Sequence, residues 1–232
     1  MSARRPSGAR TGRPAVTSRA QILGAARALI DRDGWDKLTL RGLAAELGIG
    51  TTTLYHHVRN REDLLVQLIT DHVVSQPRVE LPDDPRERII AAATVMHDGF
   101  AAVPWAAEVL TVDGFVGRLG DPALGLVEAI VGGAVECGCT HEQSVAVFRS
   151  LWYYTVGEIL VRAATAGNHA VDRAKLLDHD VRFARRDAER LPHLAAIGER
   201  WPELAARDTY AEGLRAFVDG LLTASRTPRP ER

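Results

Sequence analysis

The chain has 232 residues, of which 46% are hydrophobic and 25% are charged, and its net charge is −1. These values are ordinary for a soluble globular protein with an ample core, built as one large domain or as a small and a medium one. No apolar run approaches the roughly 18 residues of a membrane span, and the first residues lack the apolar segment of a secretory signal, so we expect a cytoplasmic protein with no membrane partner.

The charge is unevenly distributed along the chain. Residues 1–61 hold eleven Arg and Lys against four Asp and Glu, a net charge of +7, whereas residues 62–232 carry −8. A basic N-terminal quarter is typical of a phosphate-binding module, joined here to an acidic domain with another task. A chance asymmetry of the surface is the alternative.

The N-terminal region begins with an arm. Residues 1–16 are rich in Arg, Gly, Pro and Ser, and we expect them to be disordered and basic. This arm either follows DNA phosphates and the minor groove, or is an uninvolved tail. A first helix is predicted over 17–33, where apolar residues recur on one face and Gly34 ends the pattern.

Residues 38–65 carry the most informative pattern in the chain. Thr39 is a good N-cap for a short helix with apolar residues at helical spacing, and Gly48 supplies the left-handed residue that ends it. A second helix of barely two turns follows from Thr51. Two short helices around a tight turn are the helix-turn-helix plan, whose second helix lies in the major groove. The pattern therefore predicts binding to double-stranded DNA.

A longer helix follows this motif. Asn60 is its expected N-cap, Asp63 lies in its first turn where the helix dipole favours an acid, and it runs to about Ser75. Three prolines in residues 76–85 then mark a boundary between modules. The predicted organisation is an arm over 1–16, a DNA-binding domain over 17–75, a second domain over 76–226 and a tail over 227–232.

The second domain again has helical periodicity and no alternating strand pattern, which predicts an all-α protein. Thr140 with Gln143 forms a capping box at the start of its longest helix. The only cysteines, Cys137 and Cys139, are too close for an unstrained disulfide and too few for a zinc site; we expect reduced thiols, with a redox sensor as a minor alternative. The expected helices cover about 85–103, 122–137, 140–166, 180–191 and 208–224, with a short broken element after residue 104.

The block LTLRGLAAELGIGTTTLYHHVRNREDLL, residues 38–65, resembles the TetR family of one-component transcriptional repressors, and its LYxHVxN segment is especially close to the tetracycline repressors. Clear resemblance covers about residues 17–75, and the C-terminal LPHLA and FVDGLL segments are similar to the regulatory domain of the same subgroup. The resemblance implies an all-α homodimer without enzyme activity. Each N-terminal three-helix domain would read one half-site of a palindromic operator, and the larger C-terminal helical domain would hold a small-molecule pocket and the dimer interface.

The same resemblance implies how the protein is switched. Binding of the inducer would move the helix that follows the helix-turn-helix, separate the two recognition helices and release the operator. The helix at 140–166 and the last helix would form a four-helix bundle with their symmetry mates. The apolar stripe of the last helix is alternatively internal to the subunit.

The recognition helix is expected over about 51–57. Threonine hydroxyls at its start are able to bond phosphates or base edges, although Thr51 is alternatively only an N-cap. Arg41 is the candidate for a bidentate guanine contact, with a phosphate contact as the plainer alternative. Position 50 is Gly where the subgroup often has a longer side chain, so the operator sequence of the subgroup is not transferred.

Other candidates come from the resemblance. Tyr55 and His57 match residues that contact the DNA backbone, His56 stands where the tetracycline repressors carry a tryptophan, and Arg59 and Arg61 match basic positions that neutralise phosphates. The full set of candidates for contact with DNA is Thr39, Arg41, Thr51, Thr52, Thr53, Tyr55, His56, His57, Arg59 and Arg61.

The ligand pocket is expected among aromatic and polar residues on helices that, by resemblance, surround the cavity. Aromatic walls with few polar groups suit a flat, mostly apolar ligand, while each such residue alone is alternatively ordinary core or dimer interface. Tetracycline repressors hold a drug–magnesium chelate with a histidine and a glutamate, but His97 and Glu158 are not aligned with those positions, so no metal or cofactor is predicted. The candidates are Met96, His97, Phe100, Trp105, Phe115, Trp152, Tyr153 and Glu158, with Tyr154 beside them.

Two other classes of function were weighed against this interpretation. A helical enzyme with a DNA-binding appendage would need a nucleophile–base pair, a Gly-rich phosphate loop or a run of metal ligands, and the sequence has none of these. A ligand-independent architectural protein would usually be basic throughout, whereas the second domain is acidic. A ligand-responsive regulator is therefore the preferred hypothesis.

Overall fold

The computed structural model describes residues 17–111, 116–167 and 189–226, and within these ranges every regular element is a helix. The predicted arm, Phe115, the tail and most of the helix predicted over 180–191 lie outside the described residues. The all-α fold class is confirmed. The chain divides into two compact units, Met1–Leu68 and Ile69–Arg232, and each is described by itself.

The N-terminal unit is built from short helices whose ends are set by local side chains. Its elements are α1 (Arg19–Asp33), the 3-10 turn η1 (Trp35–Lys37), α2 (Leu40–Glu46), α3 (Thr51–Tyr55) and the first half of α4 (Arg61–Ser75). Ser18 and Gln21 close a capping box on α1. Asn60 Oδ1 accepts the backbone N–H of Asp63 at 2.7 Å, which confirms the predicted cap of α4.

The core of this unit is made of aliphatic side chains from each helix. Leu43 of α2, Leu54 of α3 and Leu64 of α4 are fully buried, together with Ile22 and Leu23 of α1. Because α3 has only five residues, propensity alone would not hold it in place. Burial of Leu54, and of Val58 just after it, fixes α3 against its neighbours.

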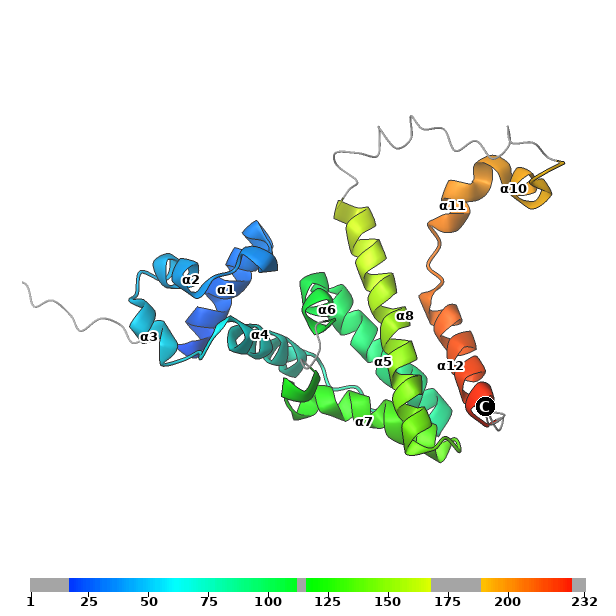
Figure 1. The fold of residues 1–232 in the computed structure, drawn as a ribbon, viewed down its shortest axis with the longest axis horizontal. Helices are drawn as coiled ribbons and strands as arrows, with labels where there is room; N and C mark the ends of the chain where they lie inside the picture. Colours follow the sequence, from blue (N-terminus) through cyan, green and yellow to red (C-terminus); the bar gives the residue numbers. More distant parts are fainter. Residues whose placement is uncertain (1–16, 112–115, 168–188, 227–232) are drawn as a thin grey trace, which may run out of the picture. The chain divides into compact units, whose positions relative to one another are not determined.

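The C-terminal unit is a bundle of longer helices (Figure 1). In it α5 packs against α7, α8 and α12, and α8 packs against α6, α7 and α12. The second half of α4 also belongs to this unit. Its elements are α5 (Pro85–Ala101), α6 (Pro104–Leu110), η2 (Val116–Arg118), α7 (Asp121–Glu136), α8 (His141–Gly167), α10 (Pro192–Ile197), η5 (Gly198–Arg200), α11 (Trp201–Ala205) and α12 (Tyr210–Arg226).

The bundle core lies where α5 meets α7 and α8. Ile89, Ile130 and Leu151 are fully buried there, and Leu214 of α12 is fully buried in the same core. The approach of α5 and α7 is close enough to need a glycine, because a Cβ at Gly133 would lie 2.8 Å from the carbonyl oxygen of Pro85. This close packing fixes the geometry of the helices that enclose the cavity described below.

The sequence located most of these helices to within two residues. The capping box of Thr140 and Gln143 is present, with the Gln143 side chain accepting the Thr140 N–H at 2.8 Å. The short helices α10 and α11 were not predicted, because neither is long enough to show a helical period. No single helix in the described ranges is long and apolar enough to cross a membrane; α5 and α6 meet that test only as a pair bent by 114°.

Candidate DNA-binding surface and ligand cavity

The turn between α2 and α3 has the geometry that the sequence predicted. Thr39 Oγ1 accepts the backbone N–H of Gly42 at 3.1 Å, which caps α2. Gly48 has a φ of 65°, a conformation that a side chain would strain. The N–H of Ile49 then donates to the carbonyl oxygen of Ala44 at 3.0 Å and tightens the turn that leads to α3.

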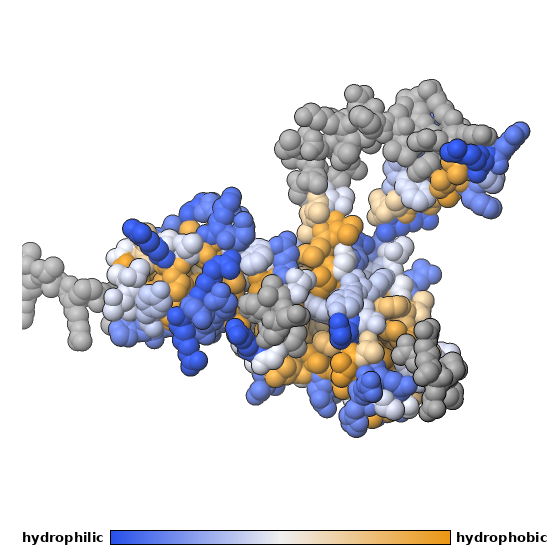
Figure 2. Space-filling model, in the orientation of Figure 1, coloured by the Kyte–Doolittle hydropathy of each residue, from blue (hydrophilic) through white to orange (hydrophobic). Residues whose placement is uncertain are grey.

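The helix α3 buries its apolar side and exposes its polar one. Thr51, Thr52 and Thr53 are exposed, as are Tyr55, with 56% of its surface accessible, and His56. The N-cap is Gly50, which makes no side-chain cap bond, so Thr51 is not the cap. The three hydroxyls are therefore available to partners outside the chain, and Figure 2 shows hydrophilic side chains over much of this unit's visible face.

The basic residues around α3 differ in how they are engaged. The side chains of Arg41 and Arg59 are exposed and have no hydrogen-bond or ion-pair partner within the described residues. His57 is half-buried and its carbonyl oxygen accepts Gln67 Nε2 at 3.1 Å, which joins the end of the recognition helix to α4.

Arg61 requires a correction. Its guanidinium donates to the carbonyl oxygens of Trp35 at 2.6 Å and Leu38 at 2.8 Å, and it lies over the Trp35 ring at 5.2 Å from the ring centre. These bonds tie α4 to the turn η1 and satisfy carbonyl groups beyond the end of α1. The sequence predicts a phosphate contact for Arg61, whereas the structure gives its guanidinium a part in holding the fold together.

The C-terminal unit contains a partly open cavity of about 460 Å³. This volume is in the range of small-molecule sites. Most of the lining is apolar, and the ring centres of Phe100 and Trp152 lie 6.0 Å apart with their planes at 82°, an edge-to-face pair. The lining residues come from the end of α4 and the segment after it (His72, Val73, Val74, Gln76, Pro77, Arg78, Val79), from α5 and α6 (Val95, Met96, Gly99, Phe100, Leu110), from Leu119 and α7 (Asp121, Pro122, Ala123, Leu126, Val127), and from α8 (Phe148, Trp152).

Of the residues predicted to bind the ligand, the cavity brings together Met96, Phe100 and Trp152. Trp105 of α6 is half-buried and does not line it, and Tyr153 is 60% exposed on α8, where its hydroxyl accepts from Arg149 at 2.6 Å. We therefore no longer place Trp105 or Tyr153 in this site.

The sequence predicts that the helix after the helix-turn-helix responds to the inducer, but the ligand candidates include no residue of α4 or of the segment after it. His72 Nε2 lies 2.8 Å from the carbonyl oxygen of Gly99, which accepts only, so Nε2 carries the hydrogen. His72 and Gln76 are four residues apart and share one side of the helix end, a spacing that was visible in the sequence. The segment 76–85 is predicted as a boundary between modules, and its residues 76–79 also form a wall of the cavity.

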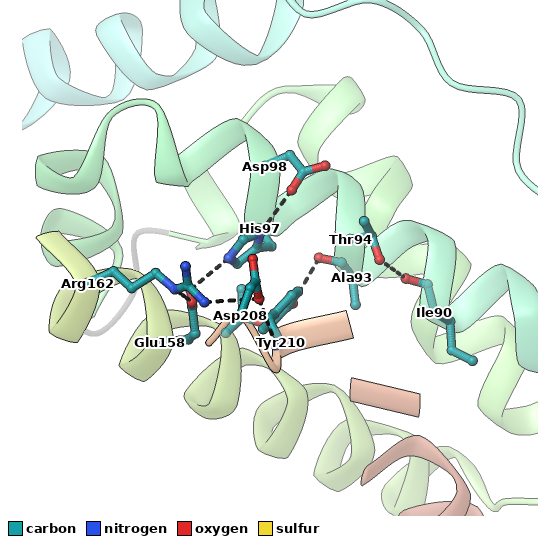
Figure 3. A network of polar contacts seen from close by, with 10 residues as sticks. Ile90, Ala93, Thr94, His97, Asp98, Glu158, Arg162, Asp208 and Tyr210 are labelled. Carbon is teal, nitrogen blue, oxygen red and sulfur yellow. Dashed lines mark hydrogen bonds and ion pairs between the residues drawn. The ribbon is translucent and has the colours of Figure 1, made fainter. Parts of the chain in front are cut away.

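His97 and Glu158 belong to a different site, a network on another side of α5 (Figure 3). His97 Nε2 lies 2.7 Å from Glu158 Oε2, its Nδ1 lies 2.9 Å from Asp98 Oδ1, and its ring stacks on Tyr210 at 3.8 Å. The residues of the network are His97, Asp98, Thr155, Glu158, Arg162, Asp208 and Tyr210.

The network fastens α12 to α5 and α8. Arg162 pairs with Glu158 on its own helix and with Asp208 at 2.9 Å, just before α12. The Tyr210 hydroxyl lies 2.8 Å from Thr155 Oγ1 and donates to the carbonyl oxygen of Ala93 at 3.4 Å. Burial raises the pKa of Tyr210 to about 12, although the bond to Thr155 opposes the shift. None of these residues lines the cavity, so His97 and Glu158 are not proposed as ligand contacts.

Comparison with known proteins decides the family. Residues 22–68 match the model of bacterial regulatory proteins of the tetR family, and residues 80–225 match the tetracycline repressor-like C-terminal domain. The chain belongs to the TetR family. These matches confirm the family resemblance that the sequence predicted, and with it a DNA-binding helix-turn-helix and a role in transcription regulation.

Individual relatives agree with this TetR assignment. The chain is 28% identical over 205 residues to the tetracycline repressor protein class A of Escherichia coli, covering 86% of this chain and 88% of that protein. It is 30% identical over 230 residues to the transcriptional repressor DrrR1 of Streptomyces coeruleorubidus, covering 94% and 81%. The solved structure of ActR from Streptomyces coelicolor in complex with actinorhodin has a TM-score of 0.72 and 21% identity over 91% of this chain and 98% of that one, which supports the fold.

Proposed function

We propose that this TetR-family regulator is a repressor that binds a palindromic operator as a homodimer and releases it when a small, largely apolar or aromatic molecule enters the cavity of the C-terminal unit. The observation that carries the proposal is the path of α4. This one helix begins directly after α3, and His72, Val73 and Val74 near its other end line the cavity.

The DNA-binding half of the proposal rests on the exposed side of α3 and its surroundings. Thr52, Thr53 and Tyr55 offer hydroxyls, and the unpaired guanidinium groups of Arg41 and Arg59 offer positive charge to phosphates or guanine edges. Thr51, His56 and His57 complete the expected surface. Thr39 is retained as a candidate contact because it is exposed, although its hydroxyl already accepts the Gly42 N–H that caps α2.

The dimer half of the proposal rests on α8 and α12. Apolar side chains that a monomer would leave in water are exposed there, with accessible fractions of 51% at Val145, 66% at Val161 and 37% at Phe217. Figure 2 shows apolar surface over the upper part of α8. Pairing these two helices with their copies in a four-helix bundle would cover them. Leu214, Val218 and Leu222 of α12 are buried within the subunit and would not take part.

The switch follows from the wall that α4 supplies to the cavity. A ligand shifts an equilibrium only by its difference in affinity for the two states, so it must contact a part that moves. A ligand that fits between Phe100 and the end of α4 meets this condition, because α4 is a rigid helix whose other end follows the recognition helix. The relatives are regulators named as repressors, and ActR is seen with a bound small molecule.

The test is selection of a binding sequence from random duplexes by the full chain, followed by footprinting. We expect a palindrome whose half-sites lie on one face of the duplex, separated by one or more helical turns, with affinity that falls steeply with salt. Repeating the gel shift with candidate aromatic compounds should identify a compound that releases the duplex. A monomer footprint on a non-palindromic site would contradict the proposed dimer, and uniform affinity for random DNA would indicate an architectural protein instead.

A further inference from the structure

The charges at the cavity point to the chemistry of its ligand. Among the described residues that line it, Arg78 is the only lysine or arginine, and Asp121 is the only acid. Arg78 is exposed and makes no hydrogen bond or ion pair within the described part of the chain. An unpaired guanidinium at the border of an apolar cavity is therefore available to a bound molecule.

Asp121 does not neutralise Arg78. The two residues form no ion pair with one another within the described part of the chain. Asp121 is the first residue of α7, a helix of 16 residues, where the positive end of the helix dipole offsets its charge. Arg78 lies between α4 and α5 in a segment without regular structure, three residues beyond the end of α4.

The remainder of the wall accepts an aromatic body. Phe100 and Trp152 meet edge-to-face, and Phe148 lines the cavity from the same helix as Trp152. His72 Nε2–H is already bonded to the Gly99 carbonyl, so the cationic side chain available to a ligand among the described lining residues is Arg78. Guanidinium groups hold carboxylates and tetrahedral oxyanions such as phosphates with paired hydrogen bonds.

We propose that the inducer is an aromatic anion, such as a carboxylate or sulfonate, whose charge is held by Arg78 and whose rings lie against Phe100 and Trp152. This inference rests on the proposed function and adds the chemical class of the ligand. A neutral aromatic molecule would leave the guanidinium without a partner, and an aromatic cation would be repelled by it.

Two fluorescent probes with the same ring system test the inference on the full chain. One is 8-anilinonaphthalene-1-sulfonate, and the other is N-phenyl-1-naphthylamine, which lacks the sulfonate. Titration of the wild type should show tighter binding of the sulfonate. Arg78→Gln should weaken the sulfonate by roughly three- to tenfold and leave the neutral probe unchanged, as expected for one charge-assisted contact at an exposed site. Arg78→Lys should retain most of the preference.

Two further variants locate the probes. Arg200→Gln, which removes an exposed arginine outside the cavity, should change neither affinity. Phe100→Leu should weaken both probes, because Phe100 lines the cavity. If Arg78→Gln and Arg200→Gln weaken the sulfonate equally, the attraction is a general charge effect and the inference is overturned; equal affinity of the wild type for the two probes overturns it as well.

The same preparations are tested for binding to the selected operator. Retained operator binding without discrimination between the probes refutes the anionic class alone and leaves the proposed repressor standing. Failure of the wild type to select any operator refutes the proposed function, while the probe titration still reports on Arg78.

Discussion

His97 of α5 and Glu158 of α8 are 61 residues apart in sequence, yet His97 Nε2 lies 2.7 Å from Glu158 Oε2. Both side chains are about 15% exposed, so the pair is largely withdrawn from water. The ring of His97 also covers the ring of Tyr210. The pair therefore joins α5, α8 and α12 on a side of α5 that does not line the cavity, and its expected task is structural.

Replacement of His97 by Ala should destabilise the C-terminal unit without changing the affinity for a ligand in the cavity. The change removes the bond to Glu158 and the stacking on Tyr210, and we expect a loss of about 1–3 kcal/mol in the free energy of unfolding. Urea denaturation measures this loss, and titration with the neutral naphthylamine probe measures the cavity. A weaker probe affinity at unchanged stability would return His97 to the ligand site.

Stability should fall at alkaline pH because of Tyr210. Its folded-state pKa of about 12 lies above the ordinary value of 10.0, so the native state holds the phenol proton more tightly than the unfolded chain does. The resulting stabilisation, on the order of 2 kcal/mol, is fully present below pH 10 and is lost as the pH rises through 12. Urea denaturation in steps across this window should show a shallower decline for Tyr210→Phe than for the wild type. Parallel declines would mean that other groups govern alkaline unfolding.

Comparison of variants at Arg41 and Arg59 should distinguish base recognition from phosphate binding. Both guanidinium groups are exposed and have no partner among the described residues, so either change should leave the fold intact. Arg41→Ala should weaken operator binding by about 1–3 kcal/mol and relax the preference at one base pair in each half-site, whereas Arg59→Ala should weaken all sequences alike and lower the salt dependence. Gel shifts on the operator and on single-base variants measure both. A uniform effect of Arg41→Ala would make it a phosphate contact.

Replacement of Arg61 should lower the stability of the fold rather than act on operator affinity directly. Its guanidinium satisfies the Trp35 and Leu38 carbonyl oxygens from within the N-terminal unit. Arg61→Ala should lower the free energy of unfolding by about 2 kcal/mol, and Arg61→Lys should restore little of it, because an ammonium cannot reproduce the planar fork. Thermal melts compared with those of Arg59→Ala provide the measurement and its control. Normal melting of Arg61→Ala with weaker operator binding would restore the phosphate assignment.

The features that sequence predicted well are those fixed by a few neighbouring residues. Thr39, Gly48 and Asn60 act within their own turns, so their caps and the helix-turn-helix could be inferred from spacing alone. The sequence also indicated that Phe100 and Trp152 line a cavity, since their helices were expected to surround one.

The features that it missed depend on contacts between distant segments. Aromatic and polar residues on α5 and α8 look alike in the sequence whether they face the cavity or the network. In the folded chain His97 meets Glu158 of α8 and Tyr210 of α12, contacts that the sequence does not show. In the same way, nothing beside Arg61 in the sequence shows that the Trp35 carbonyl, 26 residues earlier, is its partner.

The cavity itself should be required for release of DNA but not for binding it. Trp152→Ala and Phe100→Ala each remove one ring of the edge-to-face pair on the cavity wall. Both residues lie in the C-terminal unit, outside the helix-turn-helix, so operator affinity without ligand should stay close to that of the wild type. Induction should be abolished, because a ligand that loses its contacts loses the difference in affinity that drives the switch.

Loss of core volume is the competing effect in these variants. Phe100 is 6% exposed, and truncation of a buried aromatic residue costs about 3–5 kcal/mol, so its effect on folding must be separated from its effect on the switch. Trp152 is only half-buried and should melt closer to the wild type, which makes it the cleaner of the two. Gel-shift titration with an identified inducer, alongside a thermal melt of each variant, provides the comparison. Variants that melt normally and still release the operator at the wild-type inducer concentration would place the ligand site away from this cavity, and with it the role of the α4 wall in release.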